Sequence, residues 1–264
     1  MEKNYTKKLI KLKLEGIGSE GDTTGYYNCE QINIFGGIPG ETVLAEIDIQ
    51  KKTKRKKSRI YGIVKKILIS SPNRLKPPCQ FYGFCTGCNW QHIKYEHQLK
   101  LKEQIIYKEI NSRITSKINI KKIIHSEKQF NYRNHARFSI RRNGQIGFTN
   151  KVTKKFAAIN HCLIMNNKIN KYINNLENLV GETSQLSIRA SENTNSFLIQ
   201  PKFKNSDIKI ETGQKYYNEQ ISGYKFQISS SSFFQVNSNQ IENMKNTILS
   251  LIKDNKKGLL VDAY

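Results

Sequence analysis

Four cysteines have the spacing of a sulfur cage for a metal ion or cluster. Cys79, Cys85 and Cys88 form a C-x5-C-x2-C group, and Cys162 stands apart from them. Three thiolates on one tight loop and a fourth from elsewhere suit either a [4Fe–4S] cluster or a structural zinc ion. From the spacing alone, a cluster and a zinc ion are about equally probable. Aromatic residues in the loop would shield a cluster from solvent. Cys29, in a polar stretch, is interpreted as a bystander.

The charge balance predicts a polyanionic partner. The 264 residues include 44 Lys and Arg against 21 Asp and Glu, a net charge of +23, and such a field attracts polyanions. A lysine-rich surface of biased composition is the plain alternative. However, nine of the sixteen residues from Lys51 to Lys66 are basic and none is acidic. A membrane surface is the weaker partner because no amphipathic helix accompanies the run. The expected RNA contacts in this run are Lys54, Arg55, Lys56, Lys57 and Arg59.

Composition otherwise predicts a globular, cytoplasmic protein. Apolar residues make up 37% of the chain, and no apolar run approaches the ~20 residues of a membrane-spanning helix. The N-terminus alternates Lys with Leu and Ile, which is not the pattern of a signal peptide. The odd number of cysteines argues against a disulfide framework.

The elements that must position these residues are mostly strands. Alternating or branched patterns predict strands before a Pro-rich boundary at 70–79, and several strands in about 60 residues favour a small OB-like barrel. A helix is predicted over 95–111, with Leu99, Ile105, Ile106 and Ile110 on one face. Strand patterns dominate 130–232, including a hairpin turn at Gly144-Gln145. The expected first strands are 8–14, 42–49 and 59–69, and the expected last elements are a helix over 239–254 and a buried strand over 258–264.

Six ordered segments resemble one family, the RNA 5-methyluridine (uracil-C5) methyltransferases with an N-terminal TRAM domain and a [4Fe–4S] cluster. They run along the whole chain at sensible spacing, which makes the resemblance specific. The segments are GGIPGE (36–41), PPCQFYGFCTGCNWQHIKYEHQLKLK (77–102), FNYRNHARFSI (130–140), INHCLIMN (159–166), SSFFQVNSNQIENM (231–244) and GLLVDAY (258–264).

The resemblance implies a mixed α/β, multidomain fold. Residues 1–68 would form the OB-like TRAM barrel, and 69–232 a β-rich α+β domain with the iron–sulfur loop. Residues 233–264 would begin a Rossmann-like donor-binding domain, on which the helix at 95–111 would pack. Cys79, Cys85, Cys88 and Cys162 would hold the cluster.

The resemblance also assigns roles to four further residues. Gln235 and Tyr264 would line the S-adenosylmethionine pocket, and Arg133 and Arg137 would face RNA. Taken without the family, Gln235 is an ordinary polar residue at a strand end, Tyr264 is an aromatic residue at the C-terminus, and the arginines are exposed strand charges.

The catalytic groups of the family have no match in this sequence. Methylation at C5 of uridine needs a Cys thiolate to attack C6, a base to remove the C5 proton, and a flipped target base. In the family these groups lie downstream of the first donor-domain strand, but no cysteine follows Cys162 and the Gly-rich donor loop is not found. Cys29 sits in the barrel, away from any donor site. No catalytic residue is therefore assigned, and the chain is expected to be inactive alone.

Three functions remain. The first is the N-terminal part of an RNA methyltransferase, completed by a second polypeptide or else a decayed remnant, acting on ribosomal or transfer RNA. The second is a non-catalytic RNA-binding iron–sulfur or zinc protein. The third, a zinc-stabilised ribosome-associated protein, is weaker because the matches extend to the FFQVN segment at 233–237.

Overall fold

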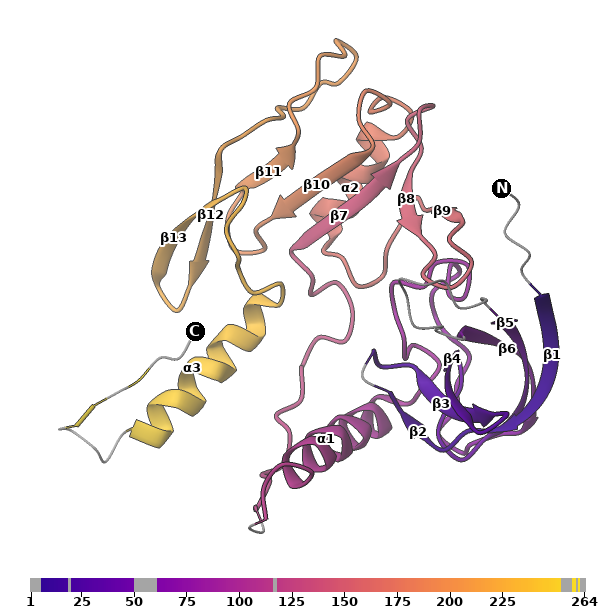
Figure 1. Cartoon of the computed structure of the whole chain (residues 1–264). Coiled ribbons are helices and arrows are strands. Elements are labelled where there is room, and N and C mark those ends of the chain that lie inside the picture. The colour runs from indigo at the N-terminus through magenta and orange to yellow at the C-terminus, as the bar shows by residue number, and fades with distance from the viewer. Residues whose placement is uncertain are drawn as a thin grey trace. The chain divides into compact units, whose positions relative to one another are not determined.

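The computed structural model describes residues 6–18, 20–49, 61–115, 118–252, 258–259 and 261. The chain divides into two compact units (Figure 1). The first unit contains residues 1–123 and 149–157, and the second contains 124–148 and 158–264. The division of the chain at residues 69 and 233 stays a prediction.

The first unit contains a six-stranded sheet that curls around one apolar core (Figure 1). The strand order is β1-β5-β6-β4-β3-β2, and its pairs are antiparallel except for β4 with β6. Alternate residues such as Ile10, Leu12, Val43, Ala45 and Ile47 point into the core, because side chains alternate along a strand. The strands are β1 (Thr6–Lys13), β2 (Gly16–Ile17), β3 (Thr23–Tyr27), β4 (Glu30–Phe35), β5 (Thr42–Ile49) and β6 (Tyr61–Ile69).

Helix α1 (Tyr95–Asn111) has the predicted bounds but buries a different residue. Leu101 is the buried residue of this helix, and it packs with Ile38 and Ile93. Ile106, from the expected apolar face, is 46% exposed. Residue periodicity indicated the helix, but the side chains of a neighbouring turn decide which position is covered.

The second unit contains most of a sheet with the order β11-β10-β7-β8-β9, in which Thr149 of β8 and Phe156 and Ala157 of β9 belong to the first unit. Gly144 has a φ of 82° and donates its N–H to the carbonyl of Arg141. A turn therefore joins β7 to β8, but its central residues are Arg142 and Asn143 and not the predicted Gly144-Gln145. A separate hairpin pairs β12 with β13. The strands are β7 (His135–Ile140), β8 (Ile146–Thr149), β9 (Phe156–Ala158), β10 (Gln185–Ala190), β11 (Phe197–Gln200), β12 (Tyr216–Ile221) and β13 (Tyr224–Ser229).

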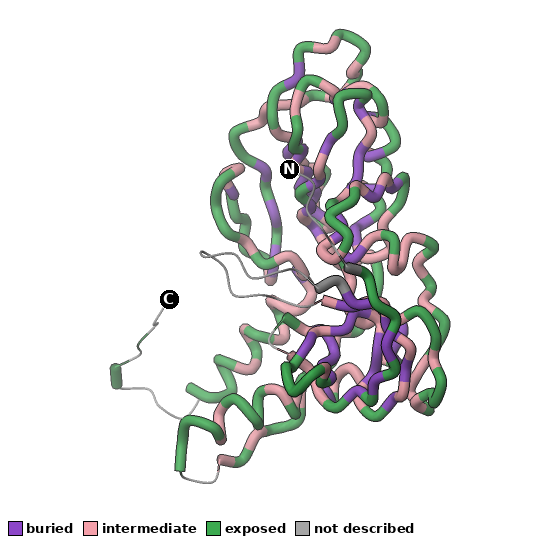
Figure 2. The backbone as a smooth tube through the Cα atoms, turned by 45° about the vertical axis from the view of Figure 1, so that its right-hand side comes forward, coloured by how far each residue is buried: buried purple, intermediate pink, exposed green. Residues whose placement is uncertain are grey.

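Two helices complete the second unit. Helix α2 (Asn167–Leu176) buries Ile169, Ile173 and Leu176, and Asn166 caps it by accepting the N–H of Ile169. Helix α3 (Ser238–Ile252) lies largely in exposed or intermediate positions, whereas the buried segments follow the strands (Figure 2). The predicted strand at 258–264 is not formed at the described residues Gly258, Leu259 and Val261, and its remaining residues lie outside the described part. Among the described residues, every helix is too short or too polar to span a bilayer.

A buried ion pair fixes the GGIPGE turn in the first unit. Glu41 is fully buried, and its two carboxylate oxygens accept from Arg74 Nε and Nη2, each at 2.6 Å. The backbone N–H groups of Ile38 and Ser71 also donate to this carboxylate. Burial raises the pKa of Glu41, but the bonds from Arg74, Ser71 and Ile38 outweigh it and hold the pKa below its ordinary value of 4.5. A carboxyl group with a lowered folded-state pKa stabilises the fold above its unfolded pKa, and this contribution is lost as the pH falls.

Substituting Arg74→Met should destabilise the protein by about 3–5 kcal/mol at pH 7, because it leaves a buried carboxylate without its cation. Without Arg74, only the N–H groups of Ile38 and Ser71 oppose the effect of burial, so Glu41 in the variant protonates more readily. The difference in the free energy of unfolding between wild type and variant should therefore become smaller as the pH falls below about 4.5.

Urea unfolding between pH 4 and 7 measures both effects. Arg113→Met is the matched control, because Arg113 pairs with Glu109 on the exposed surface of α1 and should cost less than about 1 kcal/mol. Equal losses for the two variants would contradict this role of Arg74.

Candidate nucleic-acid interface

Where β7 pairs with β10, one face of the second unit's sheet is apolar and the other is polar and basic. The polar face ends at β11, where Leu198, opposite Arg189, is buried with Tyr217 and Ile228. Ala136, Phe138, Leu186 and Ile188 alternate onto the apolar face, where Tyr172 of α2 contacts Phe197 of β11 with ring centroids 4.9 Å apart. The opposite face receives the residues between them. These are His135, Arg137 and Ser139 of β7, which pair with Arg189, Ser187 and Gln185 of β10 respectively.

His135 lies at the centre of three arginines. Burial, and after it the positive charges of Arg189, Arg137 and Arg133 in that order, together lower the pKa of His135 to about 4. Its Nε2 is 3.1 Å from Ser187 Oγ. Because the imidazole is neutral at physiological pH, it can stack on or hydrogen-bond to a base while the arginines carry the charge.

The two predicted RNA-facing arginines are both on this face, in different settings. Arg137 is exposed at the middle of β7. Arg133 is half-buried, and its Nε donates to the carbonyl of His135 at 3.0 Å. Sequence reasoning found both through the Y-R-N segment, and the structure adds that they share a face with His135.

Arg189 is a third arginine that sequence reasoning missed. It is 3% exposed, its Nη2 donates to the carbonyl of Ser232 at 2.6 Å, and its guanidinium carbon lies 5.9 Å from the centre of the Tyr217 ring. Its Nε and Nη1 have no hydrogen-bond partner within the described part of the chain. A buried cation with unsatisfied donors costs stability. The alternation of Leu186, Ile188 and Ala190 could have placed Arg189 on the other face, but only the pairing of β10 with β7 puts it beside His135.

Asn134 joins this face to the start of α3. It is 1% exposed, and its side-chain Nδ2 donates to Ser238 Oγ at 3.0 Å and to the carbonyl of Gln235 at 3.1 Å. Its backbone N–H donates to Val236, and its carbonyl accepts from Ala190. The segment around Gln235 is thus fixed to the end of β7, and Gln235 itself is exposed.

The three clustered cysteines lie on a loop of the first unit that is packed against the sheet of that unit. Cys79, Cys85 and Cys88 are all half-buried. Tyr82, within the loop, stacks on Phe35 with ring centroids 5.4 Å apart, and Trp90 Nε1 donates to the carbonyl of Gly21 at 2.7 Å. The predicted aromatic surroundings of the loop therefore serve to attach it to β4 and to the turn before β3.

Residues 149–157, around the connection from β8 to β9, belong to the first unit and also hold the cysteine loop. Asn150 Nδ2 donates to the carbonyl of Phe84 at 2.8 Å, and the N–H of Lys151 donates to Thr86 Oγ1 at 2.7 Å. Lys151 Nζ also pairs with the carboxylate of Asp22 at 2.8 Å. The cysteine loop is therefore held by contacts with three distant parts of the sequence, around Gly21, Phe35 and Asn150.

Cys162 precedes α2 in the second unit and is positioned by Asn170. The N–H of Cys162 donates to Asn170 Oδ1 at 2.8 Å, and Asn170 Nδ2 donates to the carbonyl of Cys162 at 3.1 Å. The donor chemistry of the four thiols suits an iron–sulfur cluster. Among the residues that the structure describes, however, no group of three or more His, Cys, Asp or Glu side chains is arranged to hold a metal ion. The four-sulfur cage stays a prediction.

Some predicted site residues lie outside the described residues. These are Lys54, Arg55, Lys56, Lys57 and Arg59 of the basic run and Tyr264 of the donor pocket. Cys29 is exposed at the turn between β3 and β4, with a φ of 62°, in keeping with its interpretation as a bystander.

The arrangement of sheets and helices is that of a known RNA-modifying enzyme. The chain superposes on the crystal structure of the Pyrococcus abyssi tRNA (uracil-54, C5)-methyltransferase in complex with S-adenosyl-L-homocysteine, with a TM-score of 0.61. The two are 21% identical, and the match covers 90% of this chain and 65% of that one. At this identity the likeness shows a shared fold.

Sequence relatives carry a related name. The chain is 27% identical to an uncharacterized RNA methyltransferase of Aquifex aeolicus over 96% of its length and 66% of the relative's. It is 24% identical to one from Caldanaerobacter subterraneus, with 97% and 69% covered. No protein-family model matches. The chain thus spans about two thirds of the length of these relatives.

Proposed function

We propose that this chain is the RNA-binding portion of an S-adenosylmethionine-dependent RNA (uracil-C5) methyltransferase. The observation that carries the proposal is the polar sheet face on which Arg133, Arg137 and Arg189 surround a neutral His135. The fold likeness and the names of the relatives support the same class.

The chemistry of this face suits RNA in two ways. Guanidinium groups bind phosphate oxygens bidentately and also stack on bases, which ammonium groups do not do. Imidazole rings are among the side chains on which splayed-out RNA bases stack. The net charge of +23 adds a long-range attraction to any polyanion.

Substituting Arg137→Glu should weaken binding of a single-stranded RNA about tenfold or more, and should reduce the slope of log K against log salt by about 1. The matched control is Lys171→Glu, which makes the same charge change at an exposed position of α2, the helix on the opposite face of the sheet. Fluorescence anisotropy at several salt concentrations measures both affinity and slope.

If Lys171→Glu weakens binding as much as Arg137→Glu does, overall charge explains the effect and the sheet face is not the footprint. The basic run at 51–66 can be tested in the same titration by reversing Lys54, Arg55, Lys56 and Lys57 to Glu. If the fourfold reversal greatly reduces the slope of log K against log salt and Arg137→Glu leaves it unchanged, the RNA is bound by the basic segment 51–66.

We propose that Cys79, Cys85, Cys88 and Cys162 bind a [4Fe–4S] cluster. The support is the donor set, four half-buried thiols of which three share one anchored loop, together with the family resemblance of the two segments. Anaerobically purified protein should be brown and carry about four iron atoms per chain. Cys85→Ser should bleach it, whereas Cys29→Ser should not. Stoichiometric zinc without iron after anaerobic reconstitution would contradict the proposal.

We further propose that these residues alone do not transfer a methyl group. No cysteine follows Cys162 in this chain, and C5 methylation needs a thiolate beside the donor. Apolar side chains of α3 also stay uncovered by the described residues, with Met244 47%, Ile248 46% and Leu251 63% exposed. The comparisons give no support to a second polypeptide that would cover them.

Incubating the purified chain with RNA and methyl-labelled S-adenosylmethionine should give no label above background. Titration calorimetry of the chain with S-adenosylmethionine should show no binding at micromolar concentrations. Donor-dependent formation of 5-methyluridine by the chain alone would overturn this proposal and leave the RNA-binding proposal intact.

A further inference from the structure

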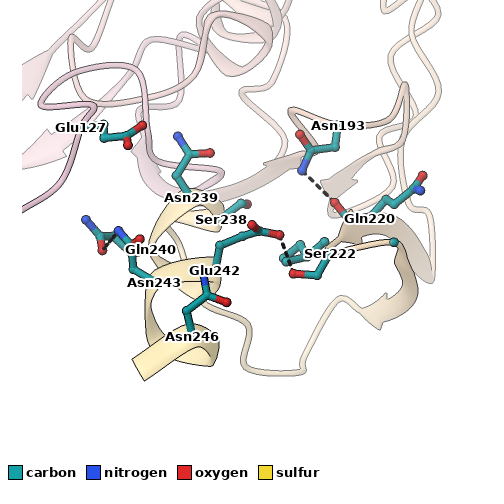
Figure 3. A pocket seen from close by; sticks show the side chains of 12 residues that line it. Glu127, Asn193, Gln220, Ser222, Ser238, Asn239, Gln240, Glu242, Asn243 and Asn246 are labelled. Atoms are coloured by element: carbon teal, nitrogen blue, oxygen red, sulfur yellow. Dashed lines mark hydrogen bonds between the residues drawn. The ribbon is translucent and has the colours of Figure 1, made fainter. Parts of the chain in front are cut away.

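A polar pocket of ≈ 610 Å³ opens in the second unit, where α3 begins (Figure 3). The β12–β13 turn forms one wall, with Ser222 and Gly223 both at positive φ as in a two-residue hairpin turn. Ser222 Oγ donates to Glu242 and accepts from Lys245 Nζ, so the turn is fixed against α3. The volume lies within the range of about 300–1,000 Å³ typical of ligand pockets.

The lining is dominated by amides. Asn239, Asn243 and Asn246 recur at i, i+4 and i+7 along α3 and therefore share one helix face. Asn193 and Gln220 line the opposite side (Figure 3). The side chains of Asn239 and Asn246 make no hydrogen bond to another described residue, so their donors and acceptors remain available to a ligand.

The charges of the lining select against phosphate. Of the twelve lining residues, none is Lys or Arg, and two, Glu127 and Glu242, are acidic. Amides pair a donor with an acceptor and match the edges of nucleobases, and carboxylates accept hydrogen bonds from amino groups and ribose hydroxyls. The lining therefore fits an uncharged group rich in both donors and acceptors, such as a nucleoside.

The pocket is directly connected to the polar face of β7 and β10 that carries Arg133, Arg137 and Arg189, here called the arginine face. Ser238 lines the pocket and accepts a hydrogen bond from Asn134 at 3.0 Å. Asn134 lies between Arg133 and His135 in the sequence, and all of these residues belong to the second unit. A polynucleotide held by its phosphates on the arginine face would thus have an amide pocket beside it.

We propose that this pocket receives a single unpaired nucleoside of the bound RNA, while the arginine face binds the neighbouring phosphates. The inference rests on the proposed RNA binding and assigns base contact and phosphate contact to different residues. The contacts expected in the pocket are hydrogen bonds between amide side chains and the edge of the base.

The test compares intact RNA with an abasic ribose-phosphate oligomer of the same length, about eight nucleotides, by fluorescence anisotropy on the full chain. Wild type should prefer intact RNA about tenfold, the factor expected for one good bidentate amide–base pair. Asn239→Ala with Asn246→Ala should abolish this preference and leave both the affinity for the abasic oligomer and the salt slope unchanged. The matched control is Asn174→Ala with Asn175→Ala, on exposed positions of α2, and it should retain the preference.

The outcomes separate the two proposals. If wild type binds neither oligomer, the proposed RNA binding is wrong and the pocket assignment fails with it. If wild type binds both oligomers equally, or if the α3 double variant keeps the preference, only the pocket assignment fails. Photocrosslinking with a 4-thiouridine oligomer tests wild type directly, and crosslinks should map to residues 220–223 or 238–246. Crosslinks confined to other segments would overturn the assignment.

Discussion

The site in the second unit depends on how one buried amide is satisfied. Asn134 has no access to water, so each of its polar groups must find a partner within the protein. Its partners come from β10, from the segment before α3 and from Ser238. The hydrogen bonds of Asn134 therefore connect the end of β10, the segment before α3 and Ser238 in the wall of the pocket. The hydrogen bonds of Asn134 also fix the backbone of its two sequence neighbours, Arg133 and His135.

The first unit solves a similar problem with charge. A fully buried carboxylate is costly unless it is paired and hydrogen-bonded. Glu41 receives two bonds from Arg74 and two from backbone N–H groups, which fixes residues 36–41 against 71–74. The cysteine loop follows within a few residues and is held again by Tyr82, Trp90 and the Asn150 turn. The loop is thus held by contacts within the first unit.

Under the proposed function, the distribution of charge in the second unit separates two kinds of RNA contact. Arginines gather on the polar face of β7 and β10, where lowering the pKa of His135 keeps the ring neutral among them. Amides and carboxylates gather in the pocket at the start of α3, where a phosphate would be repelled. Phosphate contacts give affinity and register, whereas contacts to bases give selectivity. A single polypeptide segment, residues 133–135, connects the two.

The sequence alone determined the elements with strong local signals. Periodicity placed α1 and the long strands of the first unit, and residue type indicated a turn between β7 and β8. Spacing singled out the four cysteines, and the family resemblance singled out the GGIPGE turn. Helix α2 and strand β12 were missed, since short amphipathic segments carry weak patterns. The tertiary structure alone decided that Leu101 is the buried residue of α1 and that Arg189 pairs with His135. It also decided that Glu242 and Lys245 of α3 contact the β12–β13 turn. The reason is physical: periodicity is a property of neighbouring residues, whereas strand pairing and side-chain satisfaction join residues far apart in the chain.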